Sequence, residues 1–316
     1  VHNILPSSDP ASFTHADNLA ATCGKCHVGA GSRFTIAPVH TLADDTPNVV
    51  AHWIRVIYIP LIWVTVIGML LHTLLDMVKK TRTYSLWRRR APEHCSIKER
   101  MSRPFRVAHA LAALSFFVLV YTGFALTYPD SWWAELLQFG DNEFRGQVHR
   151  IAAVGLMGAC LFHFGHLAVS ARARGQMAAF LPKVADFREF SHRLAYNLGR
   201  RTDPPAPVRV GYVEKVEYWA ALWGTFVTAI TGLVLWFENL TLTWLPGWVP
   251  EAATVLHFLE AILATLAILI WHFYSVMLDP AVYPMDMTWL TGKPPFSRAE
   301  ERGEVIDEDD AEQENA

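Results

Sequence analysis

The sequence predicts an all-α membrane protein with five spanning helices, and three observations support this class. Of the 316 residues, 52% are hydrophobic and 12 are tryptophans, a composition typical of polytopic membrane proteins. The loops between the apolar segments alternate between strongly basic and almost free of basic residues. Five apolar segments have about the 20 residues that a spanning helix requires: residues 53–76, 107–128, 148–171, 218–237 and 254–278.

The apolar segments divide the chain into five parts. We expect an extramembrane segment at 1–51, an anchor helix at 52–78, a basic loop at 79–106, a four-helix bundle at 107–279 and a C-terminal segment at 280–316. The acidic, apolar-poor end of the last segment is typical of a disordered tail. The chain opens at Val1 without a methionine or a signal-peptide pattern, which predicts a processed or trimmed N-terminus. No internal repeat stands out.

The loop-rich segment 1–51 contains a motif for covalent haem attachment. Cys23, Cys26 and His27 form the C-x-x-C-H signature. Two thiols at this spacing add to the two vinyl groups of a haem, and the adjacent histidine is then positioned to ligate the iron. The sequence therefore predicts a haem c in this segment.

The iron of this haem needs a sixth ligand if it only transfers electrons. No methionine lies nearby, and His40 is the first choice because it follows His27 within the same polar stretch of the chain, with His15 and His52 as further candidates. Two alternatives remain open, a solvated loop histidine or a ligand to a haem held by another chain.

The basic residues of the loops predict the orientation of the chain. Positively charged loops remain in the cytoplasm, and the lysine and arginine counts are ten in 79–106 and nine in 171–216, against one in 129–147 and none in 238–253. We interpret the basic runs as topology signals and lipid contacts, not as a nucleic-acid site. The N-terminus is then periplasmic and the C-terminus cytoplasmic in a bacterial inner membrane, which agrees with the attachment of c-type haem on the oxidising side.

Histidines are concentrated in the predicted spans. An imidazole is costly in hydrocarbon, so it indicates a functional residue with a partner. Imidazole is also a standard ligand of haem iron, and facing helices of a bundle are where such sites are built. Seven of the 14 histidines lie within or at the edges of the spans: His72, His109, His149, His163, His166, His257 and His272.

Depth in the membrane sorts these histidines into two haem b sites. In the last helix the spacing of His257 and His272 separates them by roughly 22 Å and about 60° of rotation. In the third helix His149 and His163 are separated by about 21 Å and about 40°. We therefore predict an outer haem b between His149 and His257. The inner haem b has His272 as one ligand, and the spacing leaves His109 and His163 as alternatives for the other.

The chain resembles a known family at this point. The segment 103–128 opens Arg-Pro-Phe-Arg-Val-Ala-His-Ala and closes Tyr-Thr-Gly-Phe, and it resembles the first helix of the di-haem cytochrome b subunits of formate dehydrogenases and nickel-iron hydrogenases. The His-Arg-Ile-Ala-Ala start of the third helix and the two-histidine last helix are similar to later helices, so that the resemblance covers roughly 103–279. It implies a four-helix di-haem b bundle with His109 and His272 on the inner haem.

The chain departs from this family in two ways, and it has an extra helix with a haem c motif fused in front. The spacing in the last helix is one residue longer than the resemblance leads us to expect, and His163 has no assigned role. The preceding helix with its haem c motif resembles membrane-bound multihaem cytochrome c and cytochrome b fusion proteins.

Four polar residues are predicted near the cytoplasmic face, and members of the family also bind quinone there. Quinone reduction takes up protons, which requires titratable or hydrogen-bonding groups at the bilayer edge. A quinone site or a third haem is the functional interpretation of the group, and hydrated helix ends are the alternative: His72, Asp76, His166 and Glu217.

The sequence thus predicts an electron-transfer subunit that connects the quinone pool with periplasmic redox partners through two haems b and a haem c. We expect a multihaem cytochrome or another redox subunit as partner within a hetero-oligomeric complex. One alternative is the membrane-anchor cytochrome subunit of a molybdenum, hydrogenase or multihaem enzyme. A more distant alternative is a haem carrier or a cytochrome assembly scaffold.

Overall fold

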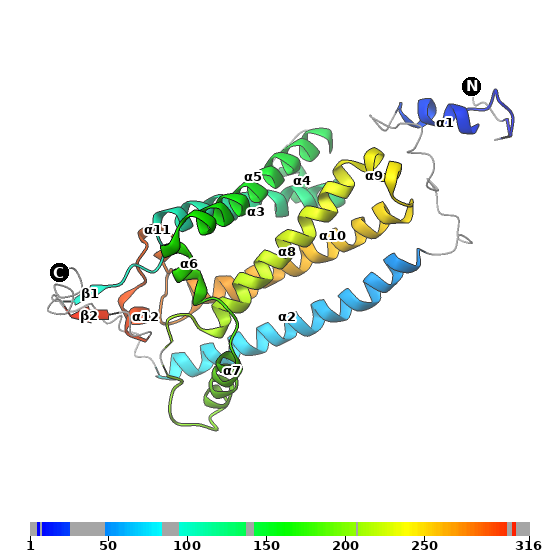
Figure 1. Cartoon of the computed structure of the whole chain (residues 1–316). Helices are drawn as coiled ribbons and strands as arrows, with labels where there is room; N and C mark the ends of the chain where they lie inside the picture. Colours follow the sequence, from blue (N-terminus) through cyan, green and yellow to red (C-terminus); the bar gives the residue numbers. More distant parts are fainter. Residues whose placement is uncertain are drawn as a thin grey trace. The chain divides into compact units, whose positions relative to one another are not determined.

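Helices dominate the structure. The computed structural model describes residues 5–6, 8–25, 48–83, 95–136, 142–206, 208–301 and 305–307 (Figure 1). In these ranges the only extended structure is a short antiparallel pair, β1 (Cys95–Ile97) with β2 (Val305–Asp307). The predicted all-α class is confirmed.

Five long helices of the described chain have the length and the apolar composition to cross a membrane. Each covers one of the five predicted apolar segments to within two residues at its end, so this part of the prediction is confirmed. The long helices are α2 (Val49–Thr83), α3 (Arg103–Thr127), α5 (Asn142–Val169), α8 (Tyr212–Trp236) and α10 (Trp248–Ala267), which continues without a break to Leu278.

The surface of these helices suits a lipid environment. Large apolar side chains face outward, and Val64, Ile151 and Leu161 are more than 70% exposed. Such a surface would be a liability in water, whereas it is the expected outer face of a spanning helix. Pro60 lies inside α2, as is tolerated in membrane helices. The chain is a multi-pass membrane protein.

Shorter helices connect the long ones, and the order of long and short helices is repeated. A long, a short and a long helix follow one another in α3–α4–α5 and again in α8–α9–α10. The short helices are α1 (Ala16–Cys23), α4 (Trp132–Leu136), α6 (Ala171–Ala178), α7 (Val184–Asn197), α9 (Glu238–Trp244), α11 (Thr288–Thr291) and α12 (Phe296–Glu301).

The chain forms two compact units. The first comprises Val1–Val64 and Phe226–Leu263, and the second comprises Thr65–Thr225 and Ala264–Ala316. Within the second unit α3 and α5 lie side by side along much of their length (Figure 1). A Cβ atom on Gly155 would lie only 2.7 Å from the hydroxyl oxygen of Ser115, so the absence of a side chain lets these two helices approach closely.

The last spanning helix changes its winding near its end. After Ala267 the chain continues as two π-helical turns, η1 (Ile268–His272) and η2 (Tyr274–Leu278). A π-turn closes its hydrogen bond over five residues instead of four and so accommodates one extra residue. Because η1 absorbs one residue, the rotation from His257 to His272 equals that of a regular α-helix with 14 steps instead of 15.

This winding makes the two-histidine helices equivalent. In an α-helix, two side chains 14 residues apart differ in direction by about 40°. Two side chains 15 residues apart differ by about 60° in the opposite sense. The histidines of the last helix therefore have the same angular relation as His149 and His163 in α5. The prediction of about 60° for the last helix assumed an unbroken α-helix and did not include this π-turn.

A buried ion-pair network fixes the end of the last helix within the second unit. Asp279 lies 2.7 Å from the ammonium of Lys80 and 2.9 Å from the guanidinium of Arg298. Lys80 also pairs with Asp76 at 2.9 Å, and Arg298 with Asp286 at 3.2 Å. Burial alone would raise the pKa of Asp279, but the two adjacent cations outweigh it and hold the pKa below its usual range.

Candidate functional site

The predicted haem c motif lies at the edge of the described chain. Cys23 is the last residue of α1 and has a free, partly exposed thiol. Cys26, His27 and His40 lie outside the described residues. The other predicted site residues all lie on the long helices, and their surroundings follow below.

His149 is held by a Thr-Gly pair on the neighbouring helix. Its Nδ1 atom lies 2.9 Å from the hydroxyl oxygen of Thr122 on α3. The next residue, Gly123, faces the same ring, because a Cβ atom there would lie 3.3 Å from Cε1 of His149. A larger residue would press on the imidazole, so the glycine permits this close approach.

His257 has the same arrangement in the other unit. Its Nδ1 atom lies 2.9 Å from the hydroxyl oxygen of Thr231 on α8. A Cβ atom on Gly232 would again lie 3.3 Å from the Cε1 atom of the ring. Two histidines on different helices are thus positioned by the same dipeptide in the same geometry.

The threonine hydroxyls determine the tautomer of both imidazoles. Each hydroxyl donates to the carbonyl four residues earlier in its own helix, Thr122 to Val118 at 2.6 Å and Thr231 to Val227 at 2.7 Å. A hydroxyl has one proton, so its oxygen accepts a hydrogen bond from the Nδ1–H of the ring. The lone pair then lies on Nε2, the form in which a histidine ligates a metal ion.

A second pair of imidazoles meets within the second unit. The ring centroids of His109 on α3 and His272 in η1 are 6.3 Å apart. This separation would leave room for one metal ion between the two rings, since each metal–nitrogen bond would take about 2 Å. The buried Nδ1 atom of His109 has no hydrogen-bond partner among the described residues. This donor set fits a haem iron.

His272 is bound by a carboxylate. Its Nδ1 atom lies 3.2 Å from Oε2 of Glu217 on α8. The hydroxyl of Ser275 donates to the other oxygen of the same carboxylate at 3.4 Å. Glu217 therefore orients His272 as the threonines orient the other two histidines.

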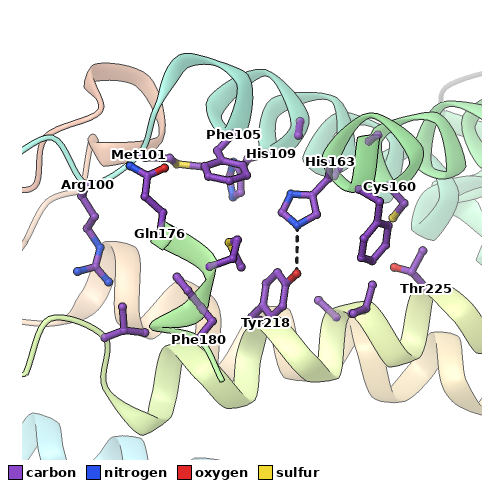
Figure 2. Close-up of a pocket in the computed structure, with 18 of the residues that line it drawn as sticks. Arg100, Met101, Phe105, His109, Cys160, His163, Gln176, Phe180, Tyr218 and Thr225 are labelled. Carbon is purple, nitrogen blue, oxygen red and sulfur yellow. Dashed lines mark hydrogen bonds between the residues drawn. The ribbon is translucent and has the colours of Figure 1, made fainter. Parts of the chain in front are cut away.

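His163 has a tyrosine as its partner. Its Nε2 atom lies 3.0 Å from the hydroxyl of Tyr218, and Figure 2 shows the two side chains pointing toward each other. The ring of Phe105 packs against His163 and also against His166, with centroid distances of 5.3 Å in each case. The structure thus brings His109 to His272 and gives His163 a different neighbour.

A cavity of about 350 Å³ lies beside these residues in the second unit (Figure 2). His109 and His163 both line it, and Phe105 and Phe180 supply flat aromatic walls. Four of its wall residues are alanines, which leave room for a broad ligand: Ala108, Ala112, Ala159 and Ala221. An apolar, flat-walled cavity next to an imidazole donor suits a porphyrin.

Two of the four residues of the predicted quinone site, His72 and Asp76, lie one turn apart on α2, and the other two contact different residues. Glu217 binds His272, and His166 packs on Phe105. His72 on α2 hydrogen-bonds to the hydroxyl of Tyr212, and its Nδ1 atom has no partner among the described residues. Asp76, one turn further along α2, accepts from the hydroxyl of Tyr274 at 2.8 Å and pairs with Lys80 at the helix end.

The sequence did contain a signal for the Thr-Gly pairs. Thr231 and Gly232 follow Thr122 and Gly123 at the same separation along the chain as His272 follows His163. The two groups of three helices therefore repeat one pattern. This repeat was missed in the sequence, together with the roles of Thr122, Thr231 and Tyr218.

Comparison with known proteins identifies the family of the chain. A search of curated proteins gives no match. Residues 100–284, more than half of the chain, match the family model described as prokaryotic cytochrome b561. This range includes the four predicted ligands of haem b, with both alternatives for the inner site, and the family consists of membrane cytochromes that bind haem b and transfer electrons. The chain belongs to the prokaryotic cytochrome b561 family.

Proposed function

We propose that the protein transfers electrons between the quinone pool and periplasmic redox partners through two haems b and one haem c. The observation that carries this proposal is that the spanning helices hold two sets of imidazoles, and that the two sets have different hydrogen-bond partners. Two histidines are bound by Thr-Gly pairs, and two more face each other at 6.3 Å beside an apolar cavity. When bound, haem b supplies a one-electron couple between ferric and ferrous iron.

The outer haem b is assigned to His149 and His257. Both lie near the periplasmic ends of their helices if the basic loops are cytoplasmic. The threonine hydroxyls hold both rings in the tautomer with its lone pair on Nε2. The matched surroundings of the two rings support their use as the two ligands of one iron.

The inner haem b is assigned to His272 and His109. The sequence left His163 as an alternative, but two observations favour His109. The rings of His109 and His272 lie 6.3 Å apart, and the Nε2 atom of His163 is bonded to Tyr218. Tyr218 thereby holds His163 in a non-ligating role.

The rest of the electron path comes from the sequence. The C-x-x-C-H motif supports a haem c on the periplasmic side, the side of the outer haem b. The quinone site is proposed at the opposite face, where His72 and Asp76 lie one turn apart on α2 and hydrogen-bond to Tyr212 and Tyr274. A periplasmic multihaem cytochrome or another redox subunit would complete the path within a hetero-oligomeric complex.

Quantitative haem analysis of purified variants tests this function. We expect two haems b and one haem c per wild-type chain, measured from the spectra of the pyridine complexes. His109→Ala should contain one haem b, because the inner iron loses a ligand, and His163→Ala should retain two. His192→Ala is the control, since His192 lies on α7 outside the spanning helices and pairs with Asp203.

Two outcomes would contradict the proposal at different levels. A wild-type protein without haem b would refute the electron-transfer function. A loss of haem b in His163→Ala and not in His109→Ala would refute the inner ligand assignment alone. Haem that exchanges freely with added haem would instead support a haem carrier.

A further inference from the structure

The repeat of the helices is broken at the inner haem b. Thr122, Gly123 and His163 have identical counterparts in Thr231, Gly232 and His272, all at one constant separation. At the same separation, however, Ala108 and His109 on α3 correspond to Glu217 and Tyr218 on α8. One helix thus supplies a candidate ligand where the other supplies a carboxylate and a phenol.

The broken repeat gives the histidines chemically different partners. The rings of the outer haem donate their Nδ1–H groups to neutral threonine hydroxyls at 2.9 Å. His272 has Oε2 of Glu217 at 3.2 Å from its Nδ1 atom. A hydroxyl is a neutral acceptor, whereas a carboxylate is charged and accepts a stronger hydrogen bond.

We propose that Glu217 tunes the inner haem b to a lower reduction potential than the outer haem b. This inference rests on the proposed assignment of His272 as an inner ligand. Glu217 does not touch the iron, and it acts through His272 as a positioning residue. The broken repeat is thus the origin of a difference between two otherwise similar sites.

The direction of the effect follows from charge. A carboxylate that accepts from Nδ1–H makes Nε2 a more electron-donating ligand. Ferric iron carries one positive charge more than ferrous iron, so a donating ligand and a nearby anion both favour the ferric state. With the haem bound, Glu217 would therefore lower the potential of the inner site relative to the outer one.

Glu217→Gln tests this role in the full-length haem-loaded protein. The amide oxygen of glutamine can still accept from Nδ1–H, so the orientation of the ring is kept while the charge is removed. We expect the midpoint potential of the inner haem to rise, that of the outer haem to stay unchanged, and both haems to be retained. Optical redox titration measures both potentials, and the component absent in His109→Ala identifies the inner haem.

Glu214→Gln is the matched control. Glu214 lies one turn earlier on α8, and its carboxylate is 3.0 Å from Arg100. It loses the same charge without touching a histidine that we assign as a ligand. Equal shifts of the inner potential in both glutamine variants would show a general field effect and overturn the proposal.

Ser275→Ala provides a second test with the opposite sign. Its hydroxyl donates to Glu217, so its removal leaves the carboxylate a stronger acceptor, and the inner potential should fall. If Glu217→Gln loses the inner haem, this variant decides the question. Two retained haems with unchanged potentials would refute the tuning role, whereas a wild-type protein without haem b would refute the proposed function itself.

Discussion

Gly123 and Gly232 each face the edge of an imidazole that is proposed to ligate the outer haem. A Cβ atom at either position would lie 3.3 Å from a ring carbon, closer than an ordinary van der Waals contact. The ring would have to move by a few tenths of an ångström, and its hydrogen bond to the adjacent threonine would change with it. These glycines therefore contribute to ligand geometry as well as to helix packing.

Alanine substitution at these glycines should weaken the outer haem. We expect Gly123→Ala and Gly232→Ala to reduce haem affinity by about 10- to 100-fold, the usual effect of disturbing the support of a metal ligand. The haem b content after purification and the midpoint potential of the outer haem measure this effect.

Gly158→Ala is the control for both variants. It lies on α5, and apart from its chain neighbours and the backbone of its own helix no atom lies within 4 Å of an added Cβ. It should keep both haems and stabilise its helix by up to about 1 kcal/mol. Equal haem loss in all three variants would contradict a specific role for Gly123 and Gly232.

The sequence was sufficient to find the candidate ligands but not the residues that position them. The intramembrane histidines were found because an imidazole in hydrocarbon needs a partner. Thr122 and Thr231 were missed, since a threonine that bonds to its own helix is common in membrane spans. His109 and His163 could not be separated, because depth and direction fit both, and the contact of His163 with Tyr218 depends on packing between helices.

Among the elements, the π-turn η1 shows what periodicity cannot predict. The apolar pattern defined the span over 254–278, but it contained no sign of a wider turn. An extra residue in a helix can rotate everything beyond it by about 100°, or it can be absorbed locally as a π-bulge. The structure shows the second solution, and it explains the departure in histidine spacing that is visible in the sequence.

Deleting a residue from this helix and inserting one should have opposite effects on haem content. Deletion of Leu269, which is half exposed within η1, should convert the turn to an α-helix and keep both haems b. Insertion of an alanine after Leu269 adds a residue that the turn cannot absorb, and it should remove the inner haem by rotating His272. Haem content and the low-spin optical spectrum test both variants, and haem loss on deletion combined with retention on insertion would refute the role of η1.

For the whole molecule, the sequence was sufficient for the fold class and the five spans, because length and apolarity determine them. The repeat of the three-helix groups was missed, since the two copies share only a few positions. The network around Asp279 was also not predicted, because it joins residues from α2, from the segment after the last helix and from α12. Burial and pairing of such distant charges depend on the complete tertiary structure.

Removal of this buried carboxylate should destabilise the protein in a pH-dependent way. The pKa of Asp279 is lowered in the folded protein, so its contribution is complete above the unfolded value of about 3.9 and is lost as the pH falls toward the lower folded value. We expect Asp279→Asn to cost about 3 kcal/mol at pH 7, since Lys80 and Arg298 lose a buried partner. The difference from wild type should shrink below about pH 4.

Thermal unfolding in detergent between pH 3 and pH 7, followed by tryptophan fluorescence, measures this difference. Asp203→Asn is the control, because the side chain of Asp203 is 64% exposed and its ion pairs should contribute little. A difference between Asp279→Asn and wild type that stays constant over this pH range would argue against the ion pairs as its cause.

The Thr-Gly pairs also bear on the biogenesis of the cytochrome. The threonine that selects the tautomer of each outer histidine belongs to the polypeptide, so the donor atom is prepared in the apoprotein. The entropy of ordering both rings is then lost during folding and does not weaken the later capture of haem. An apoprotein already inserted in the membrane would present its axial donors to arriving haem in their final chemical form.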